Sequence, residues 1–228
     1  MRSTLNTALR TAARGGLERL LALPAVRDWL SRRALAAWGG ADSIAFVCLG
    51  NICRSPFAEA VARDREPGRT LLSAGTLAKQ GRSSPAQAVQ SASAWQVDLR
   101  SHHSQWFSPE LAAKTGAIFV FDFHNLRRVL MAHPRAIKRV HLLGALRSDG
   151  PLFISDPYGT DAATFDRTLE QIAAAIPGGD QRPAPQSEHR GPAKAQRFQG
   201  ARTEAHDGSR PPRGQQHGRV GRGVTSHG

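Results

Sequence analysis

The sequence predicts a single α/β domain, in which helices cover both faces of a four-stranded parallel sheet. The four strands are expected in short runs rich in apolar residues, at residues 44–47, 70–73, 117–121 and 139–143. Such runs are typical of strands that are buried on both faces. Segments with helical spacing of apolar residues separate these runs, and strands that alternate with helices form right-handed crossovers over a parallel sheet.

The first strand leads into the stretch on which the rest of the interpretation depends. Gly50 and Asn51 end the strand 44–47, because both residues tolerate tight backbone turns. Ser55 is expected to cap a helix, with Pro56 at its first position. The residues between the strand and the helix therefore form a loop, whose inward N–H groups and adjacent helix N-terminus favour a bound anion.

Two residues of this signature loop, Cys48–Arg54, provide chemistry for a phosphoryl group. Cys48 lies at the end of the strand, where N–H groups and a guanidinium favour the thiolate, the nucleophilic form of the side chain. Arg54 offers a planar fork of donors that matches two phosphoryl oxygens. The alternative is a buried structural Cys48 beside a surface Arg54. The position of the pair between a strand and a helix favours the catalytic interpretation.

The remaining elements follow in chain order. They are a helix that continues to residue 65, a strand closed by Gly75, a polar loop at 79–84, a helix from Pro85 to about Trp95, a short helix from Pro109, a helix at 124–133, and a last helix capped by Asp161 that carries Phe165, Leu169, Ile172 and Ile176. Asp122 follows the third strand, so it lies at the same carboxyl edge of the sheet as Cys48, where parallel sheets bind ligands. We expect Asp122 either to support the site or only to begin a helix.

The two ends of the chain differ from the central domain, residues 41–176. Residues 1–40 are predicted to form a basic, amphipathic helical extension, since apolar residues such as Leu17 and Leu21 recur at helical spacing. Three interpretations of this extension stay open: a helix packed on the domain or on a partner, a helix on an anionic membrane surface, and a transit peptide. Residues 177–228 combine frequent Gly and Pro with few large apolar residues, which predicts a disordered tail.

Composition limits the functions to consider. The net charge of +13 resembles that of a nucleic-acid-binding protein, but residues 1–40 and 177–228 carry +5 each and residues 41–176 only +3. With one Tyr and no basic-aromatic alternation, specific nucleic-acid binding is not expected. Both cysteines lie in the signature loop, which excludes a disulfide scaffold and favours a reducing compartment, the cytoplasm. No apolar run reaches the roughly 20 residues of a membrane span, and two cysteines without clustered histidines do not provide a zinc site.

These motifs resemble those of the bacterial low-molecular-weight protein tyrosine phosphatases. The resemblance covers roughly residues 43–176 and rests on the segments Cys48–Ser55, Phe57–Ala60, Ser73–Thr76, Asp98–Leu99 with His102 and Ser104, and Asp156–Gly159. It implies hydrolysis of phosphotyrosine in proteins through a phosphocysteine intermediate, with no metal or other cofactor. The implied partner is a phosphotyrosine protein, such as a bacterial tyrosine kinase that controls capsule or exopolysaccharide export.

The resemblance also implies a role for each residue of the site. Cys48 is the nucleophile, Arg54 the phosphate clamp, and Asp156 the general acid that protonates the leaving oxygen. Taken alone, the Asp-Pro pair at residue 156 is typical of a plain turn. Tyr158 is implied to stack on an aryl substrate at the mouth of the site, the alternative being an ordinary loop aromatic. The expected substrate-binding residues are Leu49, Gly50, Asn51, Ile52, Cys53, Ser55 and Tyr158.

Other residues near the loop are expected to support the nucleophile. The resemblance implies that Cys53 protects Cys48, because a neighbouring thiol traps an oxidised cysteine as a disulfide before it over-oxidises. The alternative is a structural loop residue. We expect Asn51 to hydrogen-bond within the loop and Ser55 to donate to the sulfur. His102 lies in a polar stretch without an identifiable partner, so a structural or surface role is expected.

Three other functions use the same residues. Arsenate reductase chemistry on this scaffold passes a disulfide to cysteines far from the loop, and the chain has none. Phosphoarginine hydrolases of this type carry Thr at the position of Ile52, so the apolar Ile52 favours the tyrosine type. A catalytically weak module that binds an anion or a partner stays open, although Cys48, Arg54 and Asp156 are all present and nothing in the sequence indicates decay.

Overall fold

The computed structural model describes residues 16, 20, 21 and 23–178, and it confirms the predicted fold class. Four parallel strands form one sheet in the order β2-β1-β3-β4. The strands are β1 (Ser43–Cys48), β2 (Thr70–Gly75), β3 (Ala117–Val120) and β4 (Val140–Leu142). The helices are α2 (Pro24–Gly40), α3 (Arg54–Arg65), α4 (Ala86–Ser93), α5 (Pro109–Lys114), α6 (Phe123–Ala132) and α7 (Ala162–Ala175), with short 3-10 turns η1 (Pro134–Ala136) and η2 (Leu143–Leu146). The tail predicted to be disordered lies outside the described residues, apart from Pro177 and Gly178.

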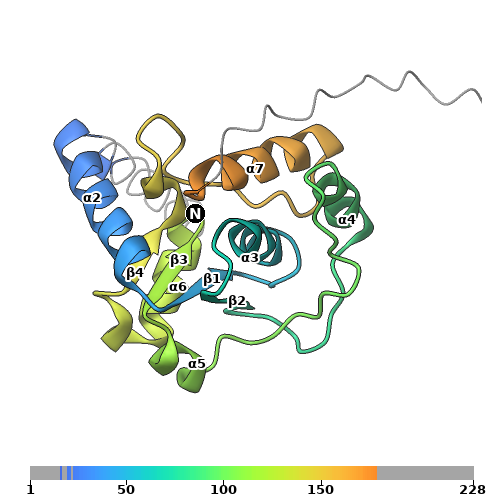
Figure 1. Ribbon diagram of the computed structural model, residues 1–228, viewed down its shortest axis with the longest axis horizontal. Helices are drawn as coiled ribbons and strands as arrows, with labels where there is room; N and C mark the ends of the chain where they lie inside the picture. The colour runs from blue at the N-terminus through green and yellow to red at the C-terminus, as the bar shows by residue number, and fades with distance from the viewer. Residues whose placement is uncertain (1–15, 17–19, 22, 179–228) are drawn as a thin grey trace, which may run out of the picture. The chain divides into compact units, whose positions relative to one another are not determined.

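The order of the strands places helices on both faces of the sheet (Figure 1). The chain moves from β1 to β2 through α3 in one direction, and from β3 to β4 through α6 in the other. Right-handed crossovers in opposite directions lie on opposite faces, so α3 and α6 cover different sides. The helix α7 packs on α3 and α4. All four strands end at the same edge, and the loops after β1, β3 and β4 meet there.

A row of side chains across the middle of the sheet forms the centre of the core. Phe46, Phe119 and His141 are paired in register on β1, β3 and β4. Trp38 of α2 packs on this row, with ring centroids 6.2 Å from Phe46 and 5.6 Å from Phe119. Phe46 and Phe119 have no exposed surface, and burying a side chain of this size contributes roughly 1.5–3 kcal/mol. The helix α2 is therefore part of the core.

Polar contacts also hold α2 in place. Trp38 Nε1 donates to Glu66 at 3.3 Å, and Arg69 donates to the carbonyl of Trp38 at 2.8 Å. Arg27 and Arg33 donate to backbone carbonyls of the loops on either side of β4. Two basic residues of the predicted amphipathic extension thus bind the domain itself.

The leucines expected before α2 are described in part. Leu21 contacts the core, Leu20 is about half exposed, and Leu17 lies outside the described residues. Because Ala34 and Trp38 are buried, a domain that begins at residue 41 lacks one of its covering helices. Within the described part of the chain, no helix is long and apolar enough to cross a membrane.

The helix after the signature loop begins earlier than the sequence predicts. α3 starts at Arg54, with Cys53 at the N-cap position and no capping side chain. The prediction of Ser55 as the N-cap is wrong, because its hydroxyl lies inside the helix and contacts Cys48 Sγ at 3.1 Å. Pro56 consequently stands in the first turn and not at the first position.

The other predicted helix ends agree more closely. Asp161 is confirmed as the N-cap of α7, since its side chain accepts from the N–H of Thr164. Asp122, expected either to support the site or to begin a helix, caps α6 by accepting from the N–H of Asn125. The helix α4 begins after Pro85, as expected, but ends at Ser93 and not near residue 95. A turn follows it directly, because the next three residues leave the helical hydrogen-bond pattern.

Candidate active site

The signature loop directs donors toward the sulfur of Cys48. Cys48 is the last residue of β1 and is 3 % exposed. Asn51 has φ of 52°, in the left-handed region, and its N–H points to Cys48 Sγ at 3.2 Å. Ser55, in the first turn of α3, lies 3.1 Å from the same sulfur. The N–H of Asn51 and the hydroxyl of Ser55 thus converge on one sulfur, which is an arrangement suited to a cysteine nucleophile.

Asn51 holds the loop in this shape. Its side chain is fully buried, and Nδ2 donates to Ser55 Oγ at 2.9 Å and to Ser73 Oγ at 3.0 Å. Its Oδ1 accepts from the N–H of Gln105 at 2.8 Å, and its carbonyl lies 2.7 Å from His102 Nε2. Ser55 Oγ accepts from Asn51 and has two further partners, the sulfur of Cys48 at 3.1 Å and the carbonyl of Ala74, to which it donates at 3.4 Å. The left-handed backbone at residue 51 costs roughly 1–2 kcal/mol, which these hydrogen bonds offset.

The end of β2 packs directly on the signature loop. The N–H of Thr76 donates to the carbonyl of Cys48 at 3.0 Å, and that of Leu77 to the carbonyl of Leu49 at 2.8 Å. A Cβ on Gly75 would lie 2.7 Å from the carbonyl oxygen of Leu49. Only glycine therefore allows this close approach of two backbones.

Arg54 is 1 % exposed and is surrounded by acceptors. Its Nη1 donates to Asp122 Oδ2 at 2.7 Å and to the carbonyl of Ile154 at 3.0 Å, and its Nη2 lies 2.7 Å from Asp156 Oδ2. Burial opposes the charge, but the neighbouring Cys48, Asp156 and Asp122 outweigh it and raise the pKa of Arg54. Its Nε is buried and has no hydrogen-bond partner among the described residues. This N–H group, beside the signature loop, is a donor for a phosphoryl oxygen.

Asp122 has both of the roles that the sequence leaves open. Its Oδ1 accepts from the N–H of Asn125 at 2.7 Å, which caps α6. Its Oδ2 binds Nη1 of Arg54. The carboxylate thus fixes the guanidinium against the start of a helix, on the side away from Asp156.

The loop after β4 brings Asp156 to Arg54. Its Oδ2 pairs with Arg54, and its Oδ1 accepts from the N–H of Tyr158 at 3.3 Å. Two residues earlier, the N–H of Ile154 donates to the carbonyl of Phe121 at 2.8 Å. Tyr158 itself is 59 % exposed. The structure therefore brings Asp156 into contact with Arg54, whereas Tyr158 extends into solvent beside them.

Cys53 differs from Cys48 in its surroundings. Both cysteines are free thiols and buried. Burial, and then the nearby Cys48 and Asp156, raise the pKa of Cys53 to about 12, so it is a neutral thiol near pH 7. Among the other predicted substrate-binding residues, Ile52 is buried, while Leu49 and Gly50 are partly exposed.

Sequence reasoning missed Ser73 and Gln105 as residues that support the loop, and it expected a structural or surface role for His102 without identifying its partner. Each of the three contacts Asn51, over sequence separations of 22 residues for Ser73, 51 for His102 and 54 for Gln105. Ser73 and His102 lie in segments that carry the family resemblance, which was the available signal. Their roles depend on which residues the fold brings together, and no local pattern reports that.

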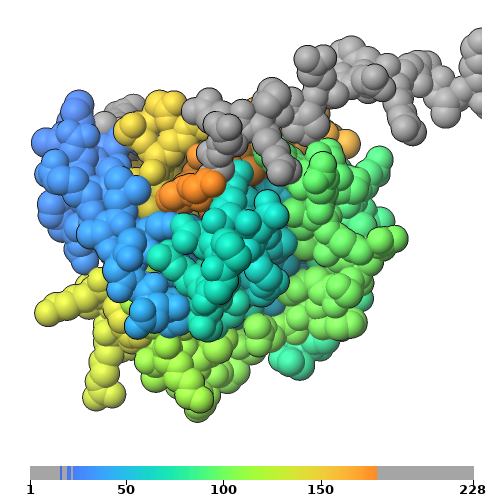
Figure 2. All heavy atoms as spheres, in the orientation of Figure 1, coloured from blue at the N-terminus to red at the C-terminus, as the bar shows by residue number. Residues whose placement is uncertain are grey.

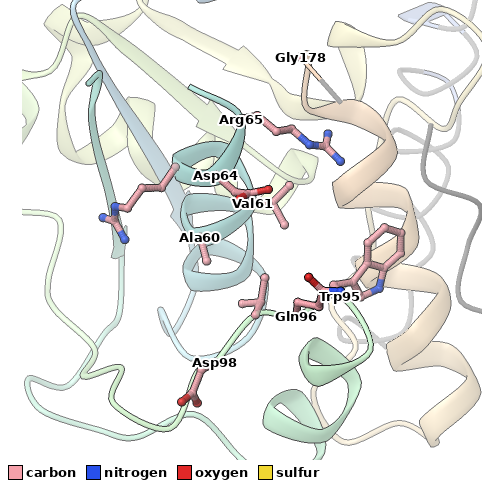
Figure 3. A pocket seen from close by; sticks show the side chains of 10 residues that line it. Ala60, Val61, Asp64, Arg65, Trp95, Gln96, Asp98 and Gly178 are labelled. Carbon is pink, nitrogen blue, oxygen red and sulfur yellow. The ribbon is translucent and has the colours of Figure 1, made fainter. Parts of the chain in front are cut away.

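A separate groove lies away from this site. It has a volume of about 600 Å³ and runs beside the C-terminal half of α3 and the turn after α4, with Asp64, Trp95 and Asp98 in its wall (Figure 3). Arg65, also in the wall, donates to the carbonyls of Ala173 and Ile176 at 2.7 and 2.6 Å and so holds the end of α7. No residue of the signature loop lines this groove.

Comparison with known proteins gives matches over the same region. The family model described as low molecular weight phosphotyrosine protein phosphatase matches residues 43–178. The probable low molecular weight protein-tyrosine-phosphatase EpsP of Ralstonia nicotianae is 31% identical over 134 residues, which cover 59% of this chain and 90% of EpsP. Two crystal structures share the fold at 28% identity and a TM-score of 0.57. The tyrosine phosphatase AmsI of Erwinia amylovora covers 60% of this chain and 89% of its own, and Wzb of Escherichia coli K30, in complex with sulphate, covers 60% and 94%.

The matched region contains all parts of the site described above. The signature loop, Asp122 and Asp156 lie within residues 43–178, whereas α2 ends at Gly40, before the match begins. The match spans more than half of the chain and includes the cysteine and the arginine that share one phosphate-sized loop. The chain therefore belongs to the low molecular weight phosphotyrosine protein phosphatase family.

Proposed function

We propose that this phosphatase hydrolyses phosphotyrosine in proteins, with Cys48 as the nucleophile. Membership of the family makes the chain a phosphatase, and the proposal concerns its residues and its substrate. The observation that carries it is the convergence on one loop of the Cys48 sulfur, the N–H of Asn51 and the buried guanidinium of Arg54. A phosphoryl group in this cradle lies beside a nucleophile and beside donors for its oxygens.

In the first step, the thiolate of Cys48 attacks the phosphorus atom of the substrate. The phosphorus–sulfur bond forms while the bond between phosphorus and the tyrosyl oxygen breaks, and the leaving oxygen takes the proton of the Asp156 carboxyl group. Arg54 and the N–H groups of the loop bind the remaining oxygens, over which the charge of the transition state is spread. A proton transfer of this kind contributes roughly 10²- to 10⁴-fold.

In the second step, Asp156 acts as a carboxylate and takes a proton from a water molecule. The oxygen of this water attacks the phosphocysteine, the phosphorus–sulfur bond breaks, and Cys48 leaves as a thiolate while inorganic phosphate is released. Asp122 keeps Arg54 in place in both steps, since one of its oxygens caps α6 and the other binds the guanidinium.

The proposed substrate is phosphotyrosine in a protein, and specifically in a bacterial tyrosine kinase of capsule or exopolysaccharide export. Tyr158 is 59 % exposed and two residues from Asp156, where its ring can stack on an aryl phosphate. The apolar Ile52 stands where phosphoarginine hydrolases carry Thr. The similarity to EpsP, a probable protein-tyrosine-phosphatase of a bacterium, supports the same class of substrate.

We further propose that the protein acts in the cytoplasm, where reducing conditions keep Cys48 unoxidised, and that residues 1–40 contact an anionic membrane surface. Arg27 and Arg33 bind backbone carbonyls of the domain. Trp29 and Leu35, which are 49 % and 47 % exposed, and the exposed Arg32 are side chains of α2 that suit such a contact. Co-sedimentation with vesicles that contain phosphatidylserine tests this, and equal binding by wild type and by Trp29→Ala/Arg32→Ala would contradict a contact through α2.

Turnover by the purified full-length protein tests the proposed function. Wild type is expected to hydrolyse p-nitrophenyl phosphate and a phosphotyrosine peptide, and to leave a phosphoarginine peptide and arsenate unchanged. Cys48→Ser is expected to lose hydrolysis while it still binds phosphate, since the clamp is intact. A preference for phosphoarginine, reduction of arsenate, or near-normal turnover by a correctly folded Cys48→Ser protein would contradict the proposal.

A further inference from the structure

The helix α2 contacts the loop that carries the proposed general acid, and it does so from outside the family match. α2 ends at Gly40, whereas the match begins at residue 43. Figure 2 shows the atoms of α2, in blue, against the yellow atoms of the chain that follows β4. The segment 147–156, which we call the acid loop, begins at this contact and ends at Asp156.

Arg27 of α2 holds the first half of the acid loop. Its guanidinium donates to three backbone carbonyls, those of Arg147 and Ser148 at 2.9 Å each and that of Gly150. These carbonyls belong to no helix or strand, so one planar fork of donors satisfies three acceptors that regular structure leaves unpaired. Without this fork, the first half of the loop depends on solvent for its hydrogen bonds, which is typical of segments that open easily.

The second half of the acid loop lies against fixed backbone. The carbonyls of Pro151 and Leu152 pack on Gly144, where a Cβ would have no room. Ile154 is fully buried, and its carbonyl accepts from Arg54 at 3.0 Å, two residues before the proposed acid. Arg27 therefore holds the first half of the acid loop, Gly144 and Ile154 hold the second half, and the acid stands just beyond Ile154.

We propose that Arg27 is a positioning residue for Asp156: by holding the acid loop from α2, it keeps the carboxyl group within reach of the leaving oxygen. The inference rests on the proposed function, because it takes Asp156 as the general acid. Misplacement of a catalytic group by about 1 Å costs up to roughly a hundredfold in rate, so a support distant from the chemistry still affects the rate. Binding of the phosphoryl group depends on the signature loop and is expected to stay unchanged.

Arg33 provides a matched control on the same helix. Its Nη2 donates to the carbonyl of Lys138 at 3.4 Å, in the chain before β4 and outside the acid loop. Arg27→Gln and Arg33→Gln thus remove the same kind of side chain from the same helix and release different loops. Arg27→Lys keeps the charge but replaces the fork with a single ammonium group, and is expected to recover part of the effect.

The test uses the full-length protein and two substrates whose leaving groups differ. p-Nitrophenol leaves readily without protonation, whereas phenol leaves phenyl phosphate slowly unless an acid assists. Arg27→Gln is expected to lower kcat/KM, which reports the formation of the phosphocysteine, about tenfold for phenyl phosphate and less than about twofold for p-nitrophenyl phosphate. Arg33→Gln is expected to lower neither kcat/KM value.

A double variant and hydrogen exchange separate positioning from a purely structural role. In an Asp156→Asn background, Arg27→Gln is expected to cause no further loss, because the group that it positions is absent. Amide exchange in residues 147–156 is expected to be faster in Arg27→Gln than in wild type. Equal losses for both substrates, a loss that persists in the Asp156→Asn background, or unchanged exchange would overturn the proposal. A wild type that hydrolyses neither substrate contradicts the proposed function itself, which is a different result from an active wild type with equal losses in Arg27→Gln.

Discussion

Asp156 Oδ2 lies 2.7 Å from Nη2 of Arg54, so the proposed acid and the proposed phosphate clamp are bound to each other. A phosphoryl group that binds Arg54 through two nitrogens competes with this carboxylate for Nη2. The side chain of Asp156 is 39 % exposed and that of Arg54 only 1 %, so the aspartate is the partner that can turn away. When substrate binds, its phosphoryl group then replaces Asp156 on Arg54, and the released Asp156 turns toward the leaving oxygen.

Removal of the Asp156 charge is expected to tighten phosphate binding. In Asp156→Asn, inorganic phosphate no longer competes with an anion for Arg54, so its inhibition constant should fall about two- to fivefold, the value of a partly exposed ion pair. Asp149→Asn is the matched control, because that aspartate also lies in the acid loop but pairs with Arg147. Competitive inhibition of p-nitrophenyl phosphate turnover measures both variants, and a weaker phosphate affinity in Asp156→Asn would argue against the replacement of Asp156 on Arg54.

Gly75→Ala is expected to disturb the signature loop more than the fold. The added Cβ would lie 2.7 Å from the carbonyl oxygen of Leu49, so the loop must shift, and turnover should fall by at least about tenfold. The cost in the free energy of unfolding should be about 1–3 kcal/mol. Gly40→Ala is the control, since nothing lies within 4 Å of that position. Normal kcat/KM in Gly75→Ala would contradict the role of β2 in shaping the loop.

Trp38→Ala is expected to lower the free energy of unfolding by about 3–5 kcal/mol, because it uncovers the aromatic row of the sheet. Trp29 lies on the same helix but is 49 % exposed, so Trp29→Ala should lower the free energy of unfolding by less than about 1 kcal/mol. Urea denaturation at pH 7 compares the two. For the same reason, a protein of residues 24–178 should be more stable than one of residues 41–178, and equal stability of the two would show that α2 adds nothing to the core.

The protein is expected to lose stability below pH 6.5 because of His141. Burial, and then the nearby Arg33, lower the pKa of His141 from 6.5 to about 4. Between these values the unfolded chain binds more protons than the folded one, so stability falls as the pH falls through this window, by up to about 3 kcal/mol. His141→Phe should flatten the dependence, while His124→Phe, at an exposed position, should not. Urea denaturation at pH 4.5, 5.5 and 7 measures the slope, and identical slopes in wild type and His141→Phe would contradict the assignment.

Cys53 is expected to make peroxide inactivation of Cys48 reversible. A thiol reductant should restore wild type through a Cys48–Cys53 disulfide, whereas Cys53→Ser should stay inactive as Cys48 advances to the sulfinic acid. Since the thiolate is the attacking form, a pKa of Cys53 that burial raises predicts that the disulfide forms faster as the pH rises. Mass spectrometry follows the bond, and full recovery of Cys53→Ser by reductant would refute the protective role.

The fold and the core of the site were predictable because they depend on contiguous patterns. The apolar run at 117–121 contains β3. Asp122 and Asp161 cap α6 and α7, the helices that begin directly after them. The signature loop is likewise one unbroken motif, so its place between a strand and a helix was predictable from the sequence, and the structure confirms this place.

The parts that were not predictable depend on residues that only the fold brings together. Arg27 and its three carbonyl acceptors are 120 to 123 residues apart, and no periodicity reports such a contact. Ser55 is a good N-cap by residue type, but its hydroxyl is already used by Asn51 and the sulfur of Cys48. The sequence predicts only that Trp38 lies in a helix. Its burial on Phe119 depends on where α2 lies over the sheet.

The central claim is that turnover passes through a phosphocysteine on Cys48. In full-length Asp156→Asn, the water that hydrolyses this intermediate lacks its base, so the intermediate should accumulate. Rapid quenching during turnover of p-nitrophenyl phosphate, followed by mass spectrometry, is expected to show one phosphoryl group on Cys48, together with a burst of p-nitrophenol. Steady turnover with no burst and no adduct, or an adduct on another residue, would contradict the account.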